Sequence, residues 1–234
     1  MEESFYRSFL ESLAEKEKQL AILIDPDKFV ISEIKSFLNK TPKKTTHLFV
    51  GGSSVAHGKT EETVKALKAE TKLPVFLFPG DYSQITSFAD ALLFLTLLSG
   101  RNAEYLVGQQ IKSISKLKNS NLEIISTGYI LIDGGNDSAV SKVTKTEPLS
   151  QKNIEVIVHT ALAGQFMGAK LIYLEAGSGA QFPVKTEIIS EVRKNINIPL
   201  IVGGGIKTES QKQAAYNAGA DMVVMGTVFE DLKT

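Results

Sequence analysis

The chain contains no cysteine, which excludes disulfides, thiolate metal ligands and a cysteine nucleophile. This absence is compatible with a reducing compartment, and we expect a cytoplasmic protein. An excess of one charge is also absent, because Lys plus Arg and Asp plus Glu both number 26 and the formal net charge is zero. Nucleic-acid-binding proteins usually carry a basic excess, so we expect no nucleic-acid partner.

Long hydrophobic runs are missing as well. The longest apolar stretch, residues 89–98, is interrupted by Asp90 and is much shorter than the roughly 20 residues that span a bilayer. The first twenty residues, MEESFYRSFLESLAEKEKQL, are charged and amphipathic, whereas a signal peptide has a basic start followed by an apolar core. We therefore expect neither a signal peptide nor a membrane anchor.

What the sequence does contain is a regular alternation of two patterns. Short runs of apolar and β-branched residues alternate with longer segments whose apolar residues recur every three or four positions, which is typical of helices. Several of the short runs are apolar almost throughout, as parallel strands buried on both faces are. We expect strands at 20–24, 47–50, 74–78, 91–95, 123–126, 171–175, 199–202 and 221–225. We expect helices, among others, at 59–70, 103–117, 185–195 and 209–218.

This alternation predicts the fold. Eight strands separated by helices favour a closed barrel over an open doubly wound sheet, and the 234 residues suit a (β/α)8 barrel, which typically needs about 250. The first strand–helix turn has the sequence IDPDK and lacks the glycine fingerprint of dinucleotide-binding folds. We predict an α/β protein, a TIM barrel that forms one domain over residues 1–234.

Two segments stand outside the alternation. Residues 4–17 are amphipathic and precede the first strand, so we expect a helix that covers the bottom mouth of the barrel, with Phe5, Phe9 and Leu13 facing inward. Residues 128–149 are rich in Gly, Asn, Asp and Ser, which predicts a long loop directly after the fifth strand. Long loops at a barrel mouth are often functional.

The last three expected strands end in glycine-rich turns. Their sequences are YLEAGSGA at 173–180, GGGI at 203–206 and GT at 226–227. Glycine lets backbone N–H groups approach an anion closely, and the following helix N-terminus adds a favourable dipole. Because phosphate sites after late strands recur in this fold, we expect phosphate-binding loops after strands six to eight. The alternative is that these glycines only make tight turns.

Acidic residues lie at two other strand ends. Asp25 follows the first strand, and its carboxylate could coordinate Mg²⁺ together with the hydroxyl of Ser53 from the next strand, although Asp-Pro-Asp is also ordinary turn chemistry. Glu175 ends an otherwise apolar strand beside a phosphate-type loop, which is where a general base would face a bound hydroxyl compound. The alternative for Glu175 is an ion pair with Lys or Arg inside the barrel. His47, His57 and His159 show no metal-ligand spacing.

Apolar side chains are abundant around strands three and four. They fit either ordinary core packing or a groove for a lipid-like substrate, and composition does not separate the two. The residues concerned are Phe76, Phe78, Phe94, Leu95, Leu97 and Leu98.

A series of motifs resembles a known family. ILIDPDK, FVGGSS, LFPG, LSGRN, YLEAGSGA, IVGGGI and AGADMVVMGT occur in the order found in the geranylgeranylglyceryl phosphate synthase family, which includes the bacterial heptaprenylglyceryl phosphate synthases. The resemblance covers about residues 22–227. It implies Mg²⁺-dependent transfer of a prenyl group, geranylgeranyl first among the candidates, from a polyprenyl diphosphate to the C3 hydroxyl of sn-glycerol 1-phosphate. The product would be an ether used in phospholipid biosynthesis.

The resemblance also implies roles for individual residues. Asp25 and Ser53 match the family's Mg²⁺ positions, and Glu175 would orient and deprotonate the attacking hydroxyl. The glycerol phosphate site would comprise Tyr173, Leu174, Glu175, Ala176, Gly177, Ser178, Gly179, Gly204, Gly205, Gly226 and Thr227. The family further implies a homo-oligomer, a dimer or hexamer, and at most transient membrane contact through the prenyl substrate or the product.

Two other functions stay open. Phosphosugar isomerases of histidine and tryptophan biosynthesis share the late phosphate loops but resemble a design with facing carboxylates on strands one and five. Here the expected fifth strand ends at 126–128 with no carboxylate until Asp133, which counts against isomerase chemistry. A non-catalytic phosphate-binding barrel would leave Asp25 and Glu175 without a purpose, so it ranks last.

Overall fold

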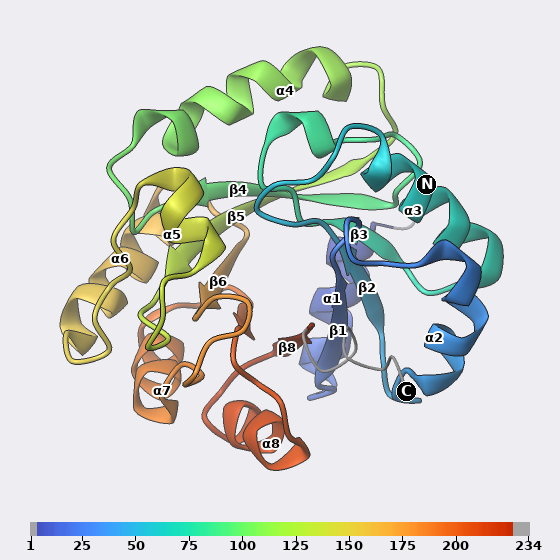
Figure 1. Cartoon of the computed structure of the whole chain (residues 1–234). Helices are drawn as coiled ribbons and strands as arrows, with labels where there is room; N and C mark the ends of the chain where they lie inside the picture. Colours follow the sequence, from blue (N-terminus) through green and yellow to red (C-terminus); the bar gives the residue numbers. More distant parts are fainter. Residues whose placement is uncertain (1–3, 227–234) are drawn as a thin grey trace.

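The computed structural model describes residues 4–226. Eight parallel strands pair in chain order, and β8 pairs back to β1, so the sheet closes into a barrel with helices around its outside (Figure 1). The predicted α/β TIM barrel is confirmed. The strands are β1 (Gln19–Ile24), β2 (His47–Val50), β3 (Val75–Leu77), β4 (Ala91–Leu97), β5 (Glu123–Leu131), β6 (Leu171–Glu175), β7 (Leu200–Gly203) and β8 (Met222–Met225).

Helices follow most of the strands. They are α1 (Phe5–Ala14), α2 (Ile34–Lys40), α3 (Lys59–Glu70), α4 (Gln109–Leu117), α5 (Ala139–Thr144), α6 (Ile154–Phe166), α7 (Thr186–Asn195) and α8 (Glu209–Asn217). Three short helical segments accompany them, namely η1 (Ile31–Glu33), η2 (Tyr82–Gln84) and η3 (Glu104–Gly108). Within residues 4–226, none of the helices combines the length and the apolar character that a membrane crossing requires.

Each strand contributes to two hydrophobic cores. In β6, Leu171 and Tyr173 pack inside the barrel, whereas Ile172 and Leu174 pack between the barrel and its helices. All five β6 residues are buried, because alternate side chains point to opposite faces and both faces are covered. The same alternation turns Glu175 inward, at the end of the strand where the site lies.

The bottom of the barrel is closed by α1, as predicted. Phe9 is buried, and Phe5 and Leu13 pack against the interior core. The Phe5 ring meets Phe76 edge-on at 5.8 Å, and His47 lies between Phe9 and Phe76. The helix ends at Ala14, earlier than the expected 17, because Lys16 leaves the helical conformation with a φ of 63°.

The fifth strand differs from the prediction. It continues through Leu131 instead of ending at 126–128, so the start of the expected loop 128–149 is strand, and α5 forms in its middle. Gly128 lies within the strand, where a Cβ would come within 2.8 Å of the side-chain ends of Ile172 and Leu98. The prediction was wrong because a glycine that packs closely against two side chains within the strand was interpreted as the beginning of a turn.

Candidate active site

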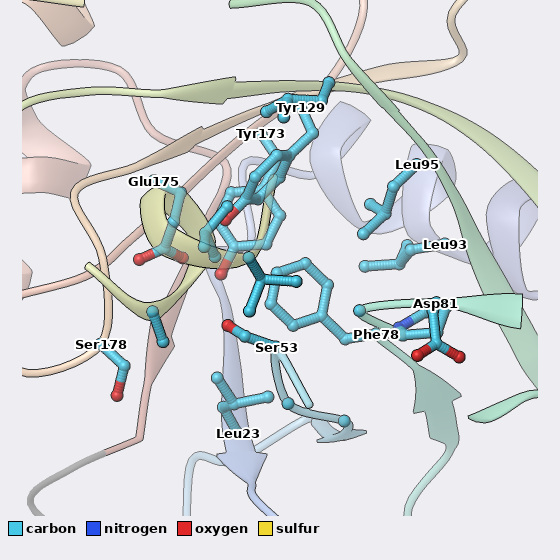
Figure 2. A pocket seen from close by; sticks show the side chains of 18 of the residues that line it. Leu23, Ser53, Phe78, Asp81, Leu93, Leu95, Tyr129, Tyr173, Glu175 and Ser178 are labelled. Atoms are coloured by element: carbon cyan, nitrogen blue, oxygen red, sulfur yellow. The ribbon is translucent and has the colours of Figure 1, made fainter. Parts of the chain in front are cut away.

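A cavity of about 390 Å³ opens at the carboxyl ends of the strands. Figure 2 shows Glu175 and Ser178 on one side of it, Ser53 near the middle, and Leu93 and Leu95 on the other side. The predicted site residues that line the cavity are Asp25, Ser53, Tyr173, Glu175, Ser178, Gly204, Gly205 and Gly226. The fold thus brings together most of the set that the sequence predicted, from five different strand ends.

The remaining predicted residues are placed differently. Ala176, Gly177 and Gly179 belong to the loop after β6 but do not line the cavity. Leu174 directs its side chain into the core beneath the outer helices, so only its backbone is near the site. Thr227 lies outside the described residues.

Glu175 is an acid of the cavity whose pKa is strongly raised. Its side chain is 5% exposed, and its Oε1 accepts a hydrogen bond of 2.7 Å from the N–H of Gly177. Burial raises the pKa of Glu175 to about 7, although the Gly177 N–H and the Tyr173 hydroxyl both act to lower it. No lysine or arginine of the described chain forms an ion pair with it, so the internal ion pair considered for Glu175 is not present. A carboxyl group with a pKa near 7 is suited to accept a proton at neutral pH.

Two tyrosines lie beside this carboxyl group. The rings of Tyr129 and Tyr173 meet edge-on at 5.5 Å, and both face the cavity near Glu175 (Figure 2). Burial, together with the nearby Glu175, raises the pKa of each hydroxyl well above its ordinary value, so both stay neutral. The buried Tyr173 hydroxyl points toward Glu175 but makes no hydrogen bond of good geometry within residues 4–226. It is therefore available as a donor to a ligand.

The loops after β6 and β7 are pressed together over Glu175. Gly204 has a φ of 79°, and a Cβ there would overlap Oε1 of Glu175 and lie 2.6 Å from the nitrogen of Gly177. Only glycine permits this approach. The N–H groups of Ser178, Gly204 and Gly205 donate to no other described residue, which leaves a group of free donors suited to a phosphate. Lys207 lines the same side of the cavity and adds a positive charge.

The predicted metal ligands line the cavity on the side of β1 and β2. Oδ1 of Asp25 accepts the N–H of Asp27 at 3.1 Å, and Oδ2 lies 3.5 Å from Nζ of Lys28. Among the described residues, no group of three or more His, Asp or Glu side chains could hold a metal ion. Mg²⁺, however, often takes only one or two protein carboxylates and completes its shell with water and substrate phosphates. The oxygen donors of Asp25 and Ser53 fit that kind of site.

The other side of the cavity is apolar. Phe78 stacks on Tyr173 with ring centroids 5.1 Å apart, and Leu93 and Leu95 continue this surface away from Glu175 (Figure 2). Of the six apolar residues noted in the sequence, Phe78, Phe94, Leu95 and Leu97 line the cavity. Phe76 packs in the barrel base, and Leu98 packs outside the barrel against Gly128 and Gly164. Core packing and a groove are therefore both present in this segment.

Comparisons with known proteins agree with this geometry. Residues 13–233 match the model of the PcrB family. The chain belongs to the PcrB family. It is 55% identical to the geranylgeranylglyceryl phosphate synthase of Zunongwangia profunda, over 92% of each chain. It is 52% identical to the synthase of the same name from Flavobacterium johnsoniae, over 97% of this chain and 94% of that one.

A solved structure of the same kind is also similar to this PcrB-family chain. It is the (S)-3-O-geranylgeranylglyceryl phosphate synthase of Thermoplasma acidophilum in complex with sn-glycerol-1-phosphate. The TM-score is 0.91 at 34% sequence identity, covering 98% of this chain and 92% of that chain. The family resemblance stated from the motifs is thus confirmed.

Several cavity residues of this PcrB-family chain were missed by sequence reasoning. They come from η2, from η3 and α4, and from α5, namely Tyr82, Tyr105, Gln109, Gln110, Ser113, Val140, Val143 and Thr144. The one available signal was Ser138, whose hydroxyl accepts the N–H of Ser141 and begins α5 within the segment expected to be a loop.

Asp133 lies two residues beyond the end of β5, closer to the strand end than expected. Its side chain is exposed, its Oδ1 accepts the N–H of Gly135, and it does not line the cavity. Facing carboxylates on β1 and β5, as in the phosphosugar isomerase design, are therefore not formed by the described residues.

Proposed function

We propose that this PcrB-family chain is a prenyltransferase that forms an ether between a polyprenyl diphosphate, geranylgeranyl diphosphate first, and the C3 hydroxyl of sn-glycerol 1-phosphate. The observation that carries the proposal is Glu175, a buried acid with a raised pKa, lying between the free N–H groups of the glycine loops and an apolar surface. The complex of the Thermoplasma acidophilum relative supports the acceptor, and the names of the curated relatives support the donor.

The acceptor would bind at the glycine loops. The N–H groups of Ser178, Gly204 and Gly205 and the side chain of Lys207 would hold the phosphate of glycerol 1-phosphate. The glycerol hydroxyl would then face Glu175, which accepts its proton as the oxygen attacks the first carbon of the prenyl chain. The neutral hydroxyl of Tyr173 would donate to the substrate and fix its orientation.

The donor would bind across the cavity. Its tail would lie along Phe78, Leu93 and Leu95, and its diphosphate would lie near Asp25 and Ser53. We propose that these two residues hold Mg²⁺ when it is bound, where it would stabilise the negative charge on the leaving diphosphate. The chain's own contribution is to aim the diphosphate end at the acceptor and to exclude water from the apolar side.

The test is product formation from radiolabelled sn-glycerol 1-phosphate with farnesyl, geranylgeranyl or heptaprenyl diphosphate, with Mg²⁺ or with EDTA. We expect a lipid-soluble ether with geranylgeranyl diphosphate and Mg²⁺, and none with EDTA. Asp25→Asn should require more Mg²⁺ for the same rate. If glycerol 1-phosphate binds but no donor gives product, the function is an isomerase or a binding protein instead.

We also propose that the chain acts as a homo-oligomer, a dimer or hexamer, in the cytoplasm. One face of α4 exposes Ile111 and Ile114, 66% and 53% exposed, and the end of α6 exposes Phe166 at 77%. Apolar patches of this kind often lie in subunit interfaces. Light scattering after size exclusion measures the assembly, and a monomeric mass at micromolar concentration contradicts it. Cell fractionation tests the location.

A further inference from the structure

Gln84 occupies an unusual position next to the site. It ends η2, its side chain is 3% exposed, and it does not line the active-site cavity. A buried primary amide must be hydrogen-bonded, and its partner here is a single residue of the neighbouring loop. Nε2 donates to the carbonyl oxygen of Gly52 at 2.8 Å, and Oε1 accepts the N–H of Gly52 at 3.3 Å.

This pairing extends the sheet beyond its last strand residues. The β2–β3 register ends with Val50 opposite Leu77, and one further bond runs from Phe78 N–H to the Val50 carbonyl. Beyond that point the side-chain amide of Gln84 bonds both the N–H and the carbonyl of Gly52, as the backbone of a neighbouring strand would. The hydrogen bonds of the Gln84 side chain therefore help to fix the loop that carries Ser53.

Gly52 borders both candidate metal ligands. It directly precedes Ser53, and a Cβ on Gly52 would lie 3.3 Å from Oδ1 of Asp25. On the other side, a Cβ on Gly80 would overlap the carbonyl oxygen of Gly52 and lie 2.6 Å from that of Ser53. The loop is thus held between Gln84, Gly80 and Asp25, and a shift of Gly52 would move the Ser53 hydroxyl relative to the Asp25 carboxylate.

The segment that carries Gln84 is itself anchored. Nζ of Lys116 on α4 donates to the carbonyls of Ser83 at 2.8 Å and Ile85 at 3.2 Å, one on each side of Gln84. Oδ1 of Asp81 accepts the N–H of Ser83 at 2.6 Å. The Gln84 side chain therefore extends from a turn that is held in place, and its hydrogen bonds hold Gly52 in place in turn.

We propose that Gln84 is a positioning residue, which sets Gly52 and Ser53 against Asp25 and thereby determines the affinity for the diphosphate end of the donor. The inference rests on the proposed function, since it takes Asp25 and Ser53 as the donor's side of the cavity. No hydrogen bond within residues 4–226 joins Gln84 to the glycine loops after β6 and β7, so we expect glycerol 1-phosphate binding to be independent of it.

The test compares two ligands on one set of full-length variants. Calorimetry measures the Kd of inorganic pyrophosphate with Mg²⁺ and, separately, the Kd of sn-glycerol 1-phosphate. Gln84→Met keeps the size but removes both hydrogen bonds, and we expect the pyrophosphate Kd to rise about tenfold while the glycerol 1-phosphate Kd stays within about twofold. Gln213→Met, on the exposed face of α8, is the matched control and should change neither Kd.

A second variant separates positioning from general loss of structure. In Gln84→Glu the ionised carboxylate accepts from Gly52 N–H but repels its carbonyl, whereas the protonated form can donate to that carbonyl. Relative to wild type at the same pH, its pyrophosphate affinity should therefore be weaker at pH 8 than at pH 6. If Gln84→Met does not fold, Lys116→Met replaces it, because freeing the turn should produce the same selective loss.

The outcomes distinguish this inference from the proposed function. A Gln84→Met protein that binds pyrophosphate like wild type, or that loses both ligands equally, overturns the role of Gln84. So does a Gln84→Glu defect that is the same at both pH values. If wild type forms no ether from any donor, the proposed function fails, whatever the variants do.

Discussion

A carboxyl group buried beside two tyrosines is costly to ionise, and Glu175 bears this cost in the folded protein. Its pKa of about 7, against 4.5 for an ordinary glutamate, arises from burial, which outweighs the lowering effects of the Gly177 N–H, hydrogen-bonded to it, and of the nearby Tyr173 hydroxyl. The ionised form is therefore a better proton acceptor than an exposed glutamate would be. At neutral pH about half of the molecules carry it.

The first prediction concerns the pH dependence of the reaction. Only ionised Glu175 can accept the hydroxyl proton, so kcat/KM should rise with pH through about 7 and then level off. Glu175→Gln should lower kcat by roughly 100-fold or more and remove this rise. Steady-state assays between pH 5.5 and 9 measure both, and a variant that keeps the wild-type rate contradicts the role of Glu175 as base.

The second prediction uses the neighbouring tyrosine. The Tyr173 hydroxyl lowers the pKa of Glu175, so Tyr173→Phe should raise that pKa and move the acidic limb of the profile to higher pH. The ring and its stacking on Phe78 remain. The same pH series measures the shift. A limb that stays in place with only a lower plateau would mean that Tyr173 contacts the substrate without tuning Glu175.

At the scale of elements, the strand ends are joined by glycines that allow close approach. The loop after β7 lies against Glu175 because Gly204 has no side chain and takes a left-handed φ of 79°. Gly58, before α3, has a similar φ of 83° but nothing within 4 Å of an added Cβ. The two positions therefore share backbone strain and differ in what surrounds them.

This pair supplies the third prediction. Gly204→Ala and Gly58→Ala should both lose about 1 kcal/mol of stability through strained φ angles, and Gly204→Ala should lose more because its methyl group would also overlap Glu175 and the backbone of Gly177. Only Gly204→Ala should also weaken glycerol 1-phosphate binding, by more than about tenfold, because the new methyl group would displace the β7 loop from Glu175. Melting curves and calorimetry separate the two effects. Equal affinities in both variants would show that the β7 loop is not part of the phosphate site.

The elements that could be predicted from sequence are those with unmixed patterns. The β2 and β6 bounds agree with the expected 47–50 and 171–175, because both runs are apolar and end at a turn or a polar residue. The predicted β5 was too short, since Gly128 packs against Leu98 and Ile172 within the strand, which no local pattern shows. α5 was missed because six residues with polar neighbours resemble a loop in sequence.

The site could be predicted only in part, for a similar reason. Asp25, Ser53 and Glu175 follow from the strand ends, because the carboxyl ends of parallel strands meet at one edge. Tyr173 was expected from the family resemblance, whereas its pairing with Tyr129 and the cavity residues of α5 depend on which faces of distant segments pack together. Gln84 could not be found at all, since its buried side chain contacts Gly52, a residue 32 positions away in the sequence.

At the scale of the whole molecule, the described barrel buries one group at each end whose pKa is shifted to a value between about 4 and 7. Glu175 lies at the mouth, and His47 lies at the base between Phe9 and Phe76, 7% exposed. Burial lowers the pKa of His47 to about 4, against 6.5 ordinarily, so the folded protein favours its neutral form. As the pH rises, His47 therefore increases the stability of the fold and Glu175 decreases it.

The fourth prediction follows from the signs. His47 contributes stability that is complete above about pH 6.5 and is lost as the pH falls toward 4, because the unfolded chain binds the proton more tightly. Glu175 has a raised pKa, so it does not reduce the free energy of unfolding below about pH 4.5. As the pH rises to 7, the unfolded chain ionises this residue more readily, and the loss of stability grows to on the order of 3 kcal/mol. Between pH 4.5 and 6.5 the two slopes oppose each other and largely cancel.

Single variants should reveal each slope. The free energy of unfolding of Glu175→Gln should rise with pH across 4.5–6.5, because only His47 still acts there. That of His47→Phe should fall over the same range, and the double variant should show neither trend. Denaturant titrations at half-unit pH steps measure these slopes, with the exposed His159→Gln as the control. If both single variants follow the wild-type curve, neither His47 nor Glu175 has the shifted pKa inferred from its burial. Glu175 would then lack the raised pKa that suits it to act as a base.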